Sequence, residues 1–296
     1  MPTATNQATG LSMSGAIGMV GLGLLGSAIG TRLRQAGFIT VGFDLDPVQL
    51  SEFRNQGGLT AASAREAVAE RLILCLPTST IAREVLGELE SALEPGAIVI
   101  DATTGDPADA ESNHDRLAKS GIQYLDATVG GSSQQALAGD AIVMAGGAPA
   151  AFERCADIFS GFARKSFHVG PAGSGARMKL VLNLALGLNR AVLAEALSFA
   201  RASGIDPQLA LSVLRAGPAY SAAMDAKGEK MIREDFAPEA KLSQHLKDVR
   251  LILESAAANG ARVPLSEVHR QLLETVERQG YGAADNSAVI KAFSGE

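Results

Sequence analysis

Residues 16–30 read AIGMVGLGLLGSAIG, a short apolar run that leads into three spaced glycines and then into a helix-like segment. The spacing Gly21-x-Gly23-x-x-Gly26 gives each glycine a physical task. Gly21 permits a tight turn, Gly23 lets the backbone approach a pyrophosphate, and Gly26 allows the helix to pack closely on the preceding strand. Because the first N–H groups of a helix have no partners within it, they can bind an anion. The stretch therefore predicts a strand, a phosphate-binding loop and a helix.

An acidic residue stands at the end of the next apolar run, where a dinucleotide site needs one. Asp44 follows the glycines by about twenty residues, and its carboxylate can accept hydrogen bonds from the adenosine ribose hydroxyls. The same carboxylate would repel a 2′-phosphate, and no arginine follows until Arg54, so the sequence favours NAD over NADP. An Asx turn before Pro47 is a compatible role for Asp46. We expect the cofactor to contact Gly21, Leu22, Gly23, Leu24, Leu25, Gly26 and Asp44.

The first half of the chain alternates short apolar runs with amphipathic segments. The apolar runs are continuous, which is typical of parallel strands that helices cover on both faces. The expected strands are residues 16–20, 39–43, 71–76, 97–101 and 122–125, with weaker candidates at 141–145 and 166–169. The expected helices are residues 24–36, 81–93 and 107–119.

The texture of the sequence changes after Gly175. Strand patterns stop there, and residues 178–203, which contain no proline, predict one long helix. Residues 1–14 are small and polar and predict a disordered leader. We therefore expect a Rossmann-type α/β domain with a doubly wound parallel sheet at residues 15–175, which binds NAD(P). An all-helical C-terminal domain at residues 176–296 would serve substrate binding and oligomerisation.

Composition and charge exclude several classes of partner. The 296 residues carry a net charge of −6 with scattered basic residues, so neither a nucleic-acid footprint nor a polybasic membrane patch is visible. Residues 16–30 do not resemble a signal peptide, because no lysine or arginine precedes Arg32, and the stretch is too short and glycine-rich to span a bilayer. A cytoplasmic protein with a small-molecule substrate is favoured.

Cysteine and histidine positions argue against disulfides and metals. Cys75 and Cys155 lie far apart in apolar surroundings without CxxC spacing, which indicates two buried free thiols in a reducing compartment. The histidines lack the HxxxH and HxxE spacings of metal sites, and most of them are expected at the surface or at helix caps. They are His114, His168, His245 and His269.

Loops at three strand ends carry further candidate binding residues, because ligands of doubly wound sheets collect at the carboxyl ends of the strands. Two loops follow the strands at 71–76 and 97–101, and a third segment, DATVGGSS at 126–133, contains adjacent glycines and hydroxyls that could bind a carboxylate. The adjacent glycines are equally compatible with a simple turn. The candidates are Leu76, Pro77 and Thr104 for the cofactor and Gly130, Gly131 and Ser132 for the substrate.

A lysine and an asparagine share one face of the predicted long helix. Lys179 and Asn183 are four residues apart inside an otherwise apolar run. Taken alone, Lys179 is compatible with a surface lysine that buries only its aliphatic stem. Partial burial would instead disfavour its charged form and lower its pKa toward the range that suits proton transfer. Asn183 could then hold a substrate hydroxyl beside the amine.

These motifs together resemble the β-hydroxyacid dehydrogenase family, which includes 3-hydroxyisobutyrate dehydrogenase, tartronate semialdehyde reductase and 6-phosphogluconate dehydrogenase. The resemblance covers residues 15–293. It rests on GLGLLG, the CLP stretch that ends at Pro77, DATTGDP, DATVGGSSQQALAGDAIVMAGG, GSGARMKLVLN and FAPEAKLSQHLKDVRLILESAAANGARVPL, in the family's order. It implies an NAD(P)-dependent oxidoreductase that acts on a small 3-hydroxy acid similar to 3-hydroxyisobutyrate. It also implies a homodimer or a homotetramer.

The resemblance further implies roles for single residues. Lys179 would be the catalytic lysine, Asn183 would help to bind the substrate, and Thr104 and Lys247 would approach the nicotinamide end of the cofactor. Asp248 is the expected structural partner of Lys247, although a solvated pair is the simpler alternative.

One position departs from the family pattern. Members typically have Ser-Gly-Gly in the substrate loop, whereas this chain has Gly130-Gly131-Ser132. Either Ser132 or Ser133 replaces the missing hydroxyl, or the substrate differs from hydroxyisobutyrate.

Two other functions are compatible with such a chain. Imine reductases share the scaffold, but they generally lack the lysine found here at position 179. A non-catalytic NAD-binding protein is the second alternative, because a fold alone does not establish an activity.

Overall fold

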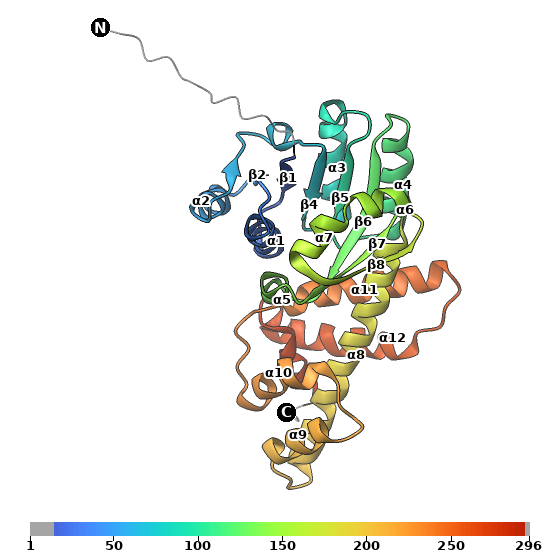
Figure 1. The fold of residues 1–296 in the computed structure, drawn as a ribbon. Coiled ribbons are helices and arrows are strands. Elements are labelled where there is room, and N and C mark those ends of the chain that lie inside the picture. Colours follow the sequence, from blue (N-terminus) through green and yellow to red (C-terminus); the bar gives the residue numbers. More distant parts are fainter. Residues whose placement is uncertain (1–14, 294–296) are drawn as a thin grey trace. The chain divides into compact units, whose positions relative to one another are not determined.

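The computed structural model describes residues 15–293 and divides into two compact units, Met1–Ala176 and Arg177–Glu296. The first is called the sheet unit below and the second the helical unit (Figure 1). The leader predicted at residues 1–14 lies outside the described residues. The α/β class followed by helices is confirmed.

One eight-stranded sheet organises the sheet unit, in the order β3-β2-β1-β4-β5-β6-β7-β8. Neighbouring strands are parallel except β6 and β7, and the register pairs Ile17 of β1 with Thr40 of β2 and Arg71 of β4. The strand order reverses between β1 and β4, which is where doubly wound sheets bind ligands. The strands are β1 Ile17–Val20, β2 Thr40–Phe43, β3 Leu59–Thr60, β4 Arg71–Leu74, β5 Ile98–Asp101, β6 Gln123–Gly130, β7 Ala141–Gly146 and β8 Ala163–Gly170.

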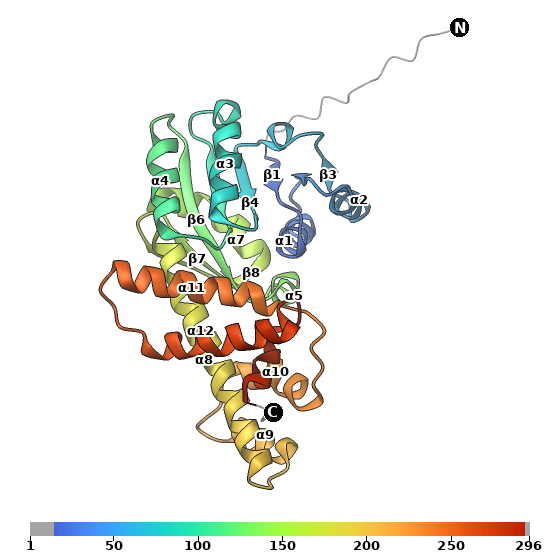
Figure 2. The ribbon, with the colours of Figure 1, turned by 180° about the vertical axis from the view of Figure 1, so that it is seen from behind.

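Helices cover both faces of this sheet. Those of the sheet unit are α1 Leu24–Gln35, α2 Pro47–Asn55, α3 Ser79–Leu89, α4 Pro107–Ala118, α5 Ser133–Ala138, α6 Pro149–Arg154 and α7 Ala156–Phe162. One apolar cluster joins α1 and α7 to the sheet through Ile29, Leu33 and Phe159. Helices α3 and α4 lie beside each other on one face of the sheet (Figure 2). A separate apolar cluster joins them to the sheet through Leu86 and Leu117. Two separate cores on a continuous sheet account for the unbroken apolar strands in the sequence.

The strands expected from the sequence are present, with three differences. The two-residue strand β3 was not expected, because it offers almost no apolar signal. Strand β6 continues to Gly130, so five of the six residues of the DATVGG motif are strand rather than loop. Strand β7 runs antiparallel to β6. The link at residues 131–140 is too short for a parallel crossover, which needs about a dozen residues or more.

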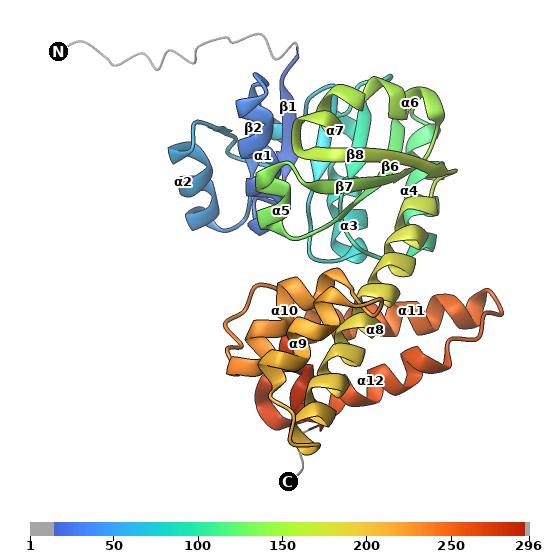
Figure 3. The same cartoon turned by 60° about the horizontal axis from the view of Figure 1, so that its bottom comes forward.

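The helical unit is built on one long helix. Helix α8, Ser174–Ala202, begins within the sheet unit and continues into the helical unit, close to the predicted 178–203. It is followed by α9 Pro207–Ala216, α10 Ala222–Arg233, α11 Leu242–Ala258, α12 Pro264–Val276 and the short turns Glu277–Tyr281 and Asn286–Phe293. Helices α11 and α12 lie side by side (Figure 3). Leu193, Leu197, Leu246, Val249 and Leu273 belong to the common core.

Helix α8 is long and apolar enough to cross a membrane by length and composition alone. The core helix of a soluble protein passes the same test. Leu193, Ala194 and Leu197 of α8 are buried in the core of the helical unit. Asn183, Gly187 and Arg190 interrupt the apolar sequence of α8 with two polar side chains and a glycine. Of the most apolar 18-residue stretch of α8, 33% is buried inside the structure.

Two expectations about side chains were wrong in part. His245 and His269 are buried, with 6% and 3% of their surface exposed, because they pack on α8 rather than cap a helix. Both cysteines are free, and Cys155 is buried as expected, but Cys75 is only partly buried. Burial raises the pKa of both thiols to about 12.

Candidate active site

The glycine loop between β1 and α1 has room for a ligand on one side only. Gly21 has φ +91°, and a Cβ at this position would collide with the carbonyl oxygen of Cys75. A Cβ at Gly26 would collide with the carbonyl oxygen of Gly21. At Gly23, by contrast, a Cβ would meet nothing within 4 Å, and no side chain caps the start of α1. The loop is therefore packed from below and open at Gly23, as a bound pyrophosphate requires.

Asp44 braces this loop from the end of β2. Its Oδ2 accepts a hydrogen bond of 2.6 Å from the backbone N–H of Leu22, and its Oδ1 accepts one of 2.9 Å from the N–H of Asp46. Asp46 in turn caps α2 by accepting from the N–H of Val48, as expected for the residue before Pro47. Asp44 thus orders the glycine loop, a role that the spacing in the sequence does not reveal.

The loops after β4 and β5 are tied to each other. The N–H of Leu76 donates to Oγ1 of Thr103 at 3.1 Å, and the N–H of Thr103 donates to Oδ1 of Asp101 at 2.9 Å. The hydroxyl of Tyr124 donates to Oδ2 of the same buried carboxyl at 2.8 Å. Burial raises the pKa of Asp101, and these hydrogen bonds oppose the rise. The loops that carry Leu76 and Thr104 therefore form one connected edge beside the glycine loop.

The predicted substrate loop is more rigid than a simple turn. Gly130 is the last residue of β6 and pairs with Ile142 of β7, and Gly131 has φ +124°, which favours glycine. Ser132 caps α5 by accepting from the N–H of Gln135 through Oγ, while its own N–H donates to the Gln135 side chain at 2.9 Å. Ser132 thus retains its hydroxyl proton as a donor, but its backbone N–H is already engaged.

In the helical unit, Lys179 and Asn183 face the first half of α11. The Nδ2 of Asn183 donates to Oδ2 of Asp248 at 2.9 Å, and Nζ of Lys247 lies 3.5 Å from Oδ1 of Asp248. Burial lowers the pKa of Lys179, and the charge of Asp248 opposes that fall. Burial raises the pKa of Asp248, and Lys247 and Lys179 oppose the rise. The expected pairing of Lys247 with Asp248 is confirmed.

Further along α8, two histidines take the place of a side chain at Gly187. A Cβ on Gly187 would lie 2.6 Å from Nε2 of His245 and 2.7 Å from Cε1 of His269. The two imidazole rings are 5.1 Å apart, and burial lowers the pKa of both, to about 4 for His269. They remain neutral near pH 7 and fix the spacing of α8 against α11 and α12.

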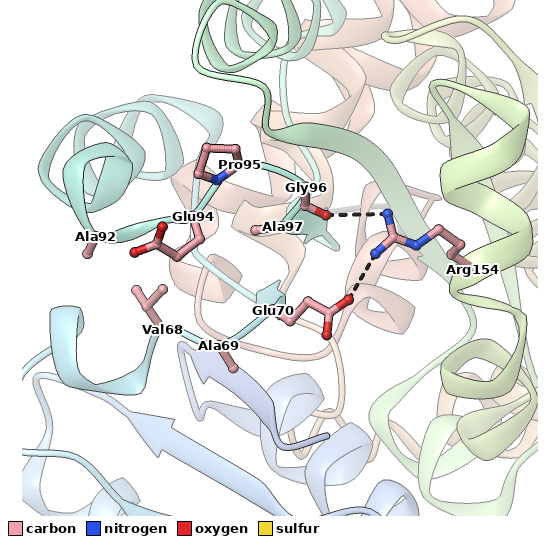
Figure 4. Close-up of a pocket in the computed structure, with 9 residues that line it drawn as sticks. All are labelled: Val68, Ala69, Glu70, Ala92, Glu94, Pro95, Gly96, Ala97 and Arg154. Carbon is pink, nitrogen blue, oxygen red and sulfur yellow. Dashed lines mark hydrogen bonds and ion pairs between the residues drawn. The ribbon is translucent and has the colours of Figure 1, made fainter. Parts of the chain in front are cut away.

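Two further features concern metal binding and a hollow on the sheet unit. Within residues 15–293, no three His, Cys, Asp or Glu side chains gather in a way that could hold a metal ion. A hollow of about 360 Å³ lies at the amino ends of β4 and β5 (Figure 4). There Arg154 bridges Glu70 and the carbonyl oxygen of Gly96. The glycine loop follows the carboxyl end of β1, which is parallel to β4, so the hollow and the loop lie at opposite ends of the strands. The hollow is not part of the cofactor edge.

Both halves of the chain match known protein families. Residues 16–170 match the NAD binding domain of 6-phosphogluconate dehydrogenase, and residues 173–293 match the family described as the NAD-binding domain of NADP-dependent 3-hydroxyisobutyrate dehydrogenase. The chain belongs to the β-hydroxyacid dehydrogenase family. It is thus an NAD(P)-dependent oxidoreductase of the class that acts on hydroxyl groups of hydroxy acids.

Individual relatives extend over nearly the whole chain. L-threonate dehydrogenase of Cupriavidus necator is 30% identical over 290 residues, which is 96% of this chain and 97% of the relative. 2-(Hydroxymethyl)glutarate dehydrogenase of Eubacterium barkeri is 31% identical, over 94% of each chain. The solved structure of 3-hydroxyisobutyrate dehydrogenase from Salmonella typhimurium is 29% identical with a TM-score of 0.86 and covers 93% of this chain and 99% of its own. An imine reductase of Myxococcus stipitatus shares the fold, at 18% identity and a TM-score of 0.64 over 94% of this chain and 99% of its own.

Proposed function

We propose that the protein transfers hydride between NAD and a small 3-hydroxy acid, with Lys179 as the general acid and base. The observation that supports this most is the arrangement of Lys179, Asn183 and Asp248 in the helical unit. Burial lowers the pKa of Lys179, which favours the neutral amine, the form that can accept a proton. The expectation that the substrate resembles 3-hydroxyisobutyrate rests on the named relatives.

NAD rather than NADP is the proposed cofactor. The open face at Gly23 fits a pyrophosphate, and the carboxylate of Asp44 beside it fits ribose hydroxyls better than a 2′-phosphate. The loops at Leu76, Pro77 and Thr104 would hold the nicotinamide half, and the family resemblance implies the same role for Lys247. When bound, the nicotinamide supplies or accepts the hydride.

The protein's own groups handle the proton and the orientation of the acid. In oxidation, neutral Lys179 accepts the hydroxyl proton as the carbon gives up its hydride, and in reduction the ammonium returns the proton. Because Asn183 directs Nδ2 at Asp248, its Oδ1 can accept a hydrogen bond from the substrate hydroxyl. Gly130, Gly131 and Ser132 would bind the carboxylate, Ser132 through its hydroxyl.

Two alternative functions remain. One is imine reduction on the same scaffold, and the other is NAD binding without catalysis. The intact Lys179, Asn183 and Asp248 arrangement favours hydroxy-acid chemistry over both. We further propose a cytoplasmic homodimer or homotetramer. The exposed apolar side chains of α8 and α9 would pack between subunits; they include Val181, Val192, Phe199, Leu209 and Val213.

A Lys179→Ala variant tests the assignment. Wild type is first screened with C3–C5 hydroxy acids, with and without a phosphate or sulfonate, and with cyclic imines, by NADH absorbance. With the best acid, kcat of Lys179→Ala should fall by roughly 10² or more, the usual range for general acid–base catalysis. NAD affinity should persist, and the melting temperature should hold or rise, because a partly buried amine is removed. Lys119→Ala, at an exposed position of the sheet unit, is the matched control. Near wild-type turnover in Lys179→Ala would refute the mechanism.

A further inference from the structure

Strand β6 holds a buried carboxyl group that the proposed chemistry does not use. Asp126 is 3% exposed, and its Oδ1 and Oδ2 accept hydrogen bonds from the backbone N–H groups of Gly173 at 3.0 Å and Ala176 at 2.8 Å. Two residues along β6, Oγ1 of the fully buried Thr128 donates to the carbonyl oxygen of Gly175 at 2.9 Å. Both side chains therefore form hydrogen bonds with the backbone at the start of α8.

The backbone of this turn approaches the strands closely. A Cβ at Gly175 would collide with the carbonyl oxygen of Asp126 and lie 2.7 Å from that of Met144 in β7. A Cβ at Gly146 would lie 2.5 Å from Oδ1 of Asp126 and 2.6 Å from the carbonyl oxygen of Pro171. The start of α8 thus lies directly on the backbone of β6 and β7, and two side chains on β6 fix it there.

The same turn leads directly to Lys179. In an α-helix the N–H of residue 179 bonds to the carbonyl oxygen of residue 175, which is the oxygen that Thr128 holds. Asn183 follows one turn later on the same face. We propose that Asp126 and Thr128 are positioning residues for the reaction, which fix the first turn of α8 and thereby the backbone that carries Lys179 and Asn183. The inference rests on the role of Lys179 proposed above.

Stability alone would not select a carboxylate here. Burial raises the pKa of Asp126 to about 6, and the hydrogen bonds from Ala176 and Gly173 offset only part of that cost. A carboxylate is needed because both of its oxygens accept from backbone N–H groups, whereas an asparagine offers a single acceptor. The arrangement therefore sacrifices some stability for a defined helix start, as functional positions often do.

Asp126→Asn tests the proposal, measured in the direction in which the carbonyl product is reduced to the hydroxy acid. We expect kcat to fall by about tenfold or more, since a small misplacement of a reacting group can cost up to about 10²-fold. The dissociation constant for NADH should stay within about twofold. The melting temperature should fall by no more than a few degrees, because the amide leaves one backbone N–H without an acceptor but also removes a buried charge. Wild-type kcat should decrease below about pH 6 as Asp126 is protonated, and this limb should be absent in Asp126→Asn.

The other ionisable groups near Asp126 remain in the variant, so they cannot explain the loss of that limb. They are Asp101 on β5 and Tyr124 on β6; residues 144–146 and 173–176, which pack against Asp126, include no ionisable side chain. Thr128→Val should lower kcat in the same way, and Thr128→Ser, which keeps the donor, should restore it. Unchanged kcat in Asp126→Asn, or a loss of melting temperature with unchanged kcat and an unchanged acid limb, would overturn the proposal.

A double variant separates this proposal from the proposed function. If Asp126 acts through Lys179, adding Asp126→Asn to Lys179→Ala should lower the residual turnover no further. An equal fold-loss in both backgrounds would overturn the positioning role. Full activity of Lys179→Ala would instead overturn the function itself, and exchange of the amide hydrogens at residues 173–179 would still report whether Asp126 holds the turn.

Discussion

The side-chain amide of Asn183 donates a 2.9 Å hydrogen bond to Asp248, which ties α8 to α11 inside the helical unit. The same carboxylate lies 3.5 Å from Nζ of Lys247, and its charge acts on Lys179. One buried acid thus orients the amide and raises the pKa of the proposed base against the larger effect of burial. The pKa of Lys179 therefore depends on Asp248 as well as on the apolar side chains around the lysine.

Asp248→Asn should shift the pH dependence of acid oxidation to lower pH. The carboxylate raises the pKa of Lys179 against the effect of burial, so removing its charge should lower that pKa further. Oxidation needs neutral Lys179, and the rising limb of kcat against pH should therefore move toward acid. The measurement is kcat from about pH 6 to 10. The maximal kcat on the plateau at high pH is compared separately from the pH at which kcat rises.

Asp248→Ala provides the comparison for this prediction. It removes both the charge and the acceptor for Asn183, so it should shift the limb and also raise KM for the acid. Asp248→Asn retains an acceptor oxygen and should leave KM closer to wild type. A limb that moves to higher pH, or does not move in either variant, would show that Asp248 does not act on the base.

Asp44→Ser should reduce the preference for NAD over NADP and weaken the binding of both. The preference falls because the charge that opposes a 2′-phosphate is removed. Overall affinity falls because the brace on the N–H of Leu22 is lost. Titration of the protein with each reduced cofactor, followed by the fluorescence of the nicotinamide, measures both effects. Asp46→Ala is the matched control; it removes only the cap of α2 and should lower stability by about 1 kcal/mol while leaving cofactor preference intact. Tighter binding of NADP than NAD by wild type would contradict the assignment.

Gly130→Ser should change the ranking of acids without affecting NAD affinity. It restores the hydroxyl that family members carry at this position, at the end of β6. Relative kcat/KM across the acid panel is the measurement. Ser132→Ala is the companion variant: it removes a helix cap, and if Ser132 also binds the carboxylate it should raise KM for every acid. An equal loss for all acids in Gly130→Ser would count against a role in selectivity.

Much of the fold could be predicted from the sequence because its signals are local. The glycine spacing, the apolar runs and the helix periodicity each act over a few residues, and the strands and the long helix follow from them. Strand β3 was missed because two residues carry no period, and the direction of β7 depends on the length of its link rather than on its own composition.

The candidate site was less accessible because its supporting contacts are far apart in the sequence. Asp126 lies 50 residues from Ala176, and Asn183 lies 65 residues from Asp248. The family motif pointed to Asp126 only as part of a binding loop. The expectation that most histidines lie at the surface or at helix caps fails for His245 and His269, because no nearby sequence signal shows that Gly187 leaves room for them on α8.

Asp285 should be the residue most sensitive to acid in the helical unit. Although burial alone would raise its pKa, hydrogen bonds from Lys227 and Ser287 lower the pKa to about 2. A carboxyl with a depressed pKa stabilises the fold above its unfolded value of about 3.9, and this stabilisation is lost as pH falls through 2. The shift of almost two units corresponds to about 2.5 kcal/mol. Urea unfolding between pH 5 and pH 2 should show this loss in wild type.

Replacing Asp285 should be more damaging than protonating it. Asp285 is fully buried and accepts from Nζ of Lys227 at 3.0 Å and from the N–H groups of Glu239 and Ala240 at 3.1 Å. Asp285→Ala leaves the buried Lys227 ammonium with only the half-exposed Glu239 as an acid partner, and breaking a buried pair in this way costs about 3–5 kcal/mol. Adding Lys227→Met should recover part of the loss, because the unpaired charge is removed. Glu239→Gln, which affects the exposed half of the network, should cost no more than about 1 kcal/mol. If Asp285→Ala unfolds at the same urea concentration as Glu239→Gln, the buried pair does not stabilise the helical unit as described.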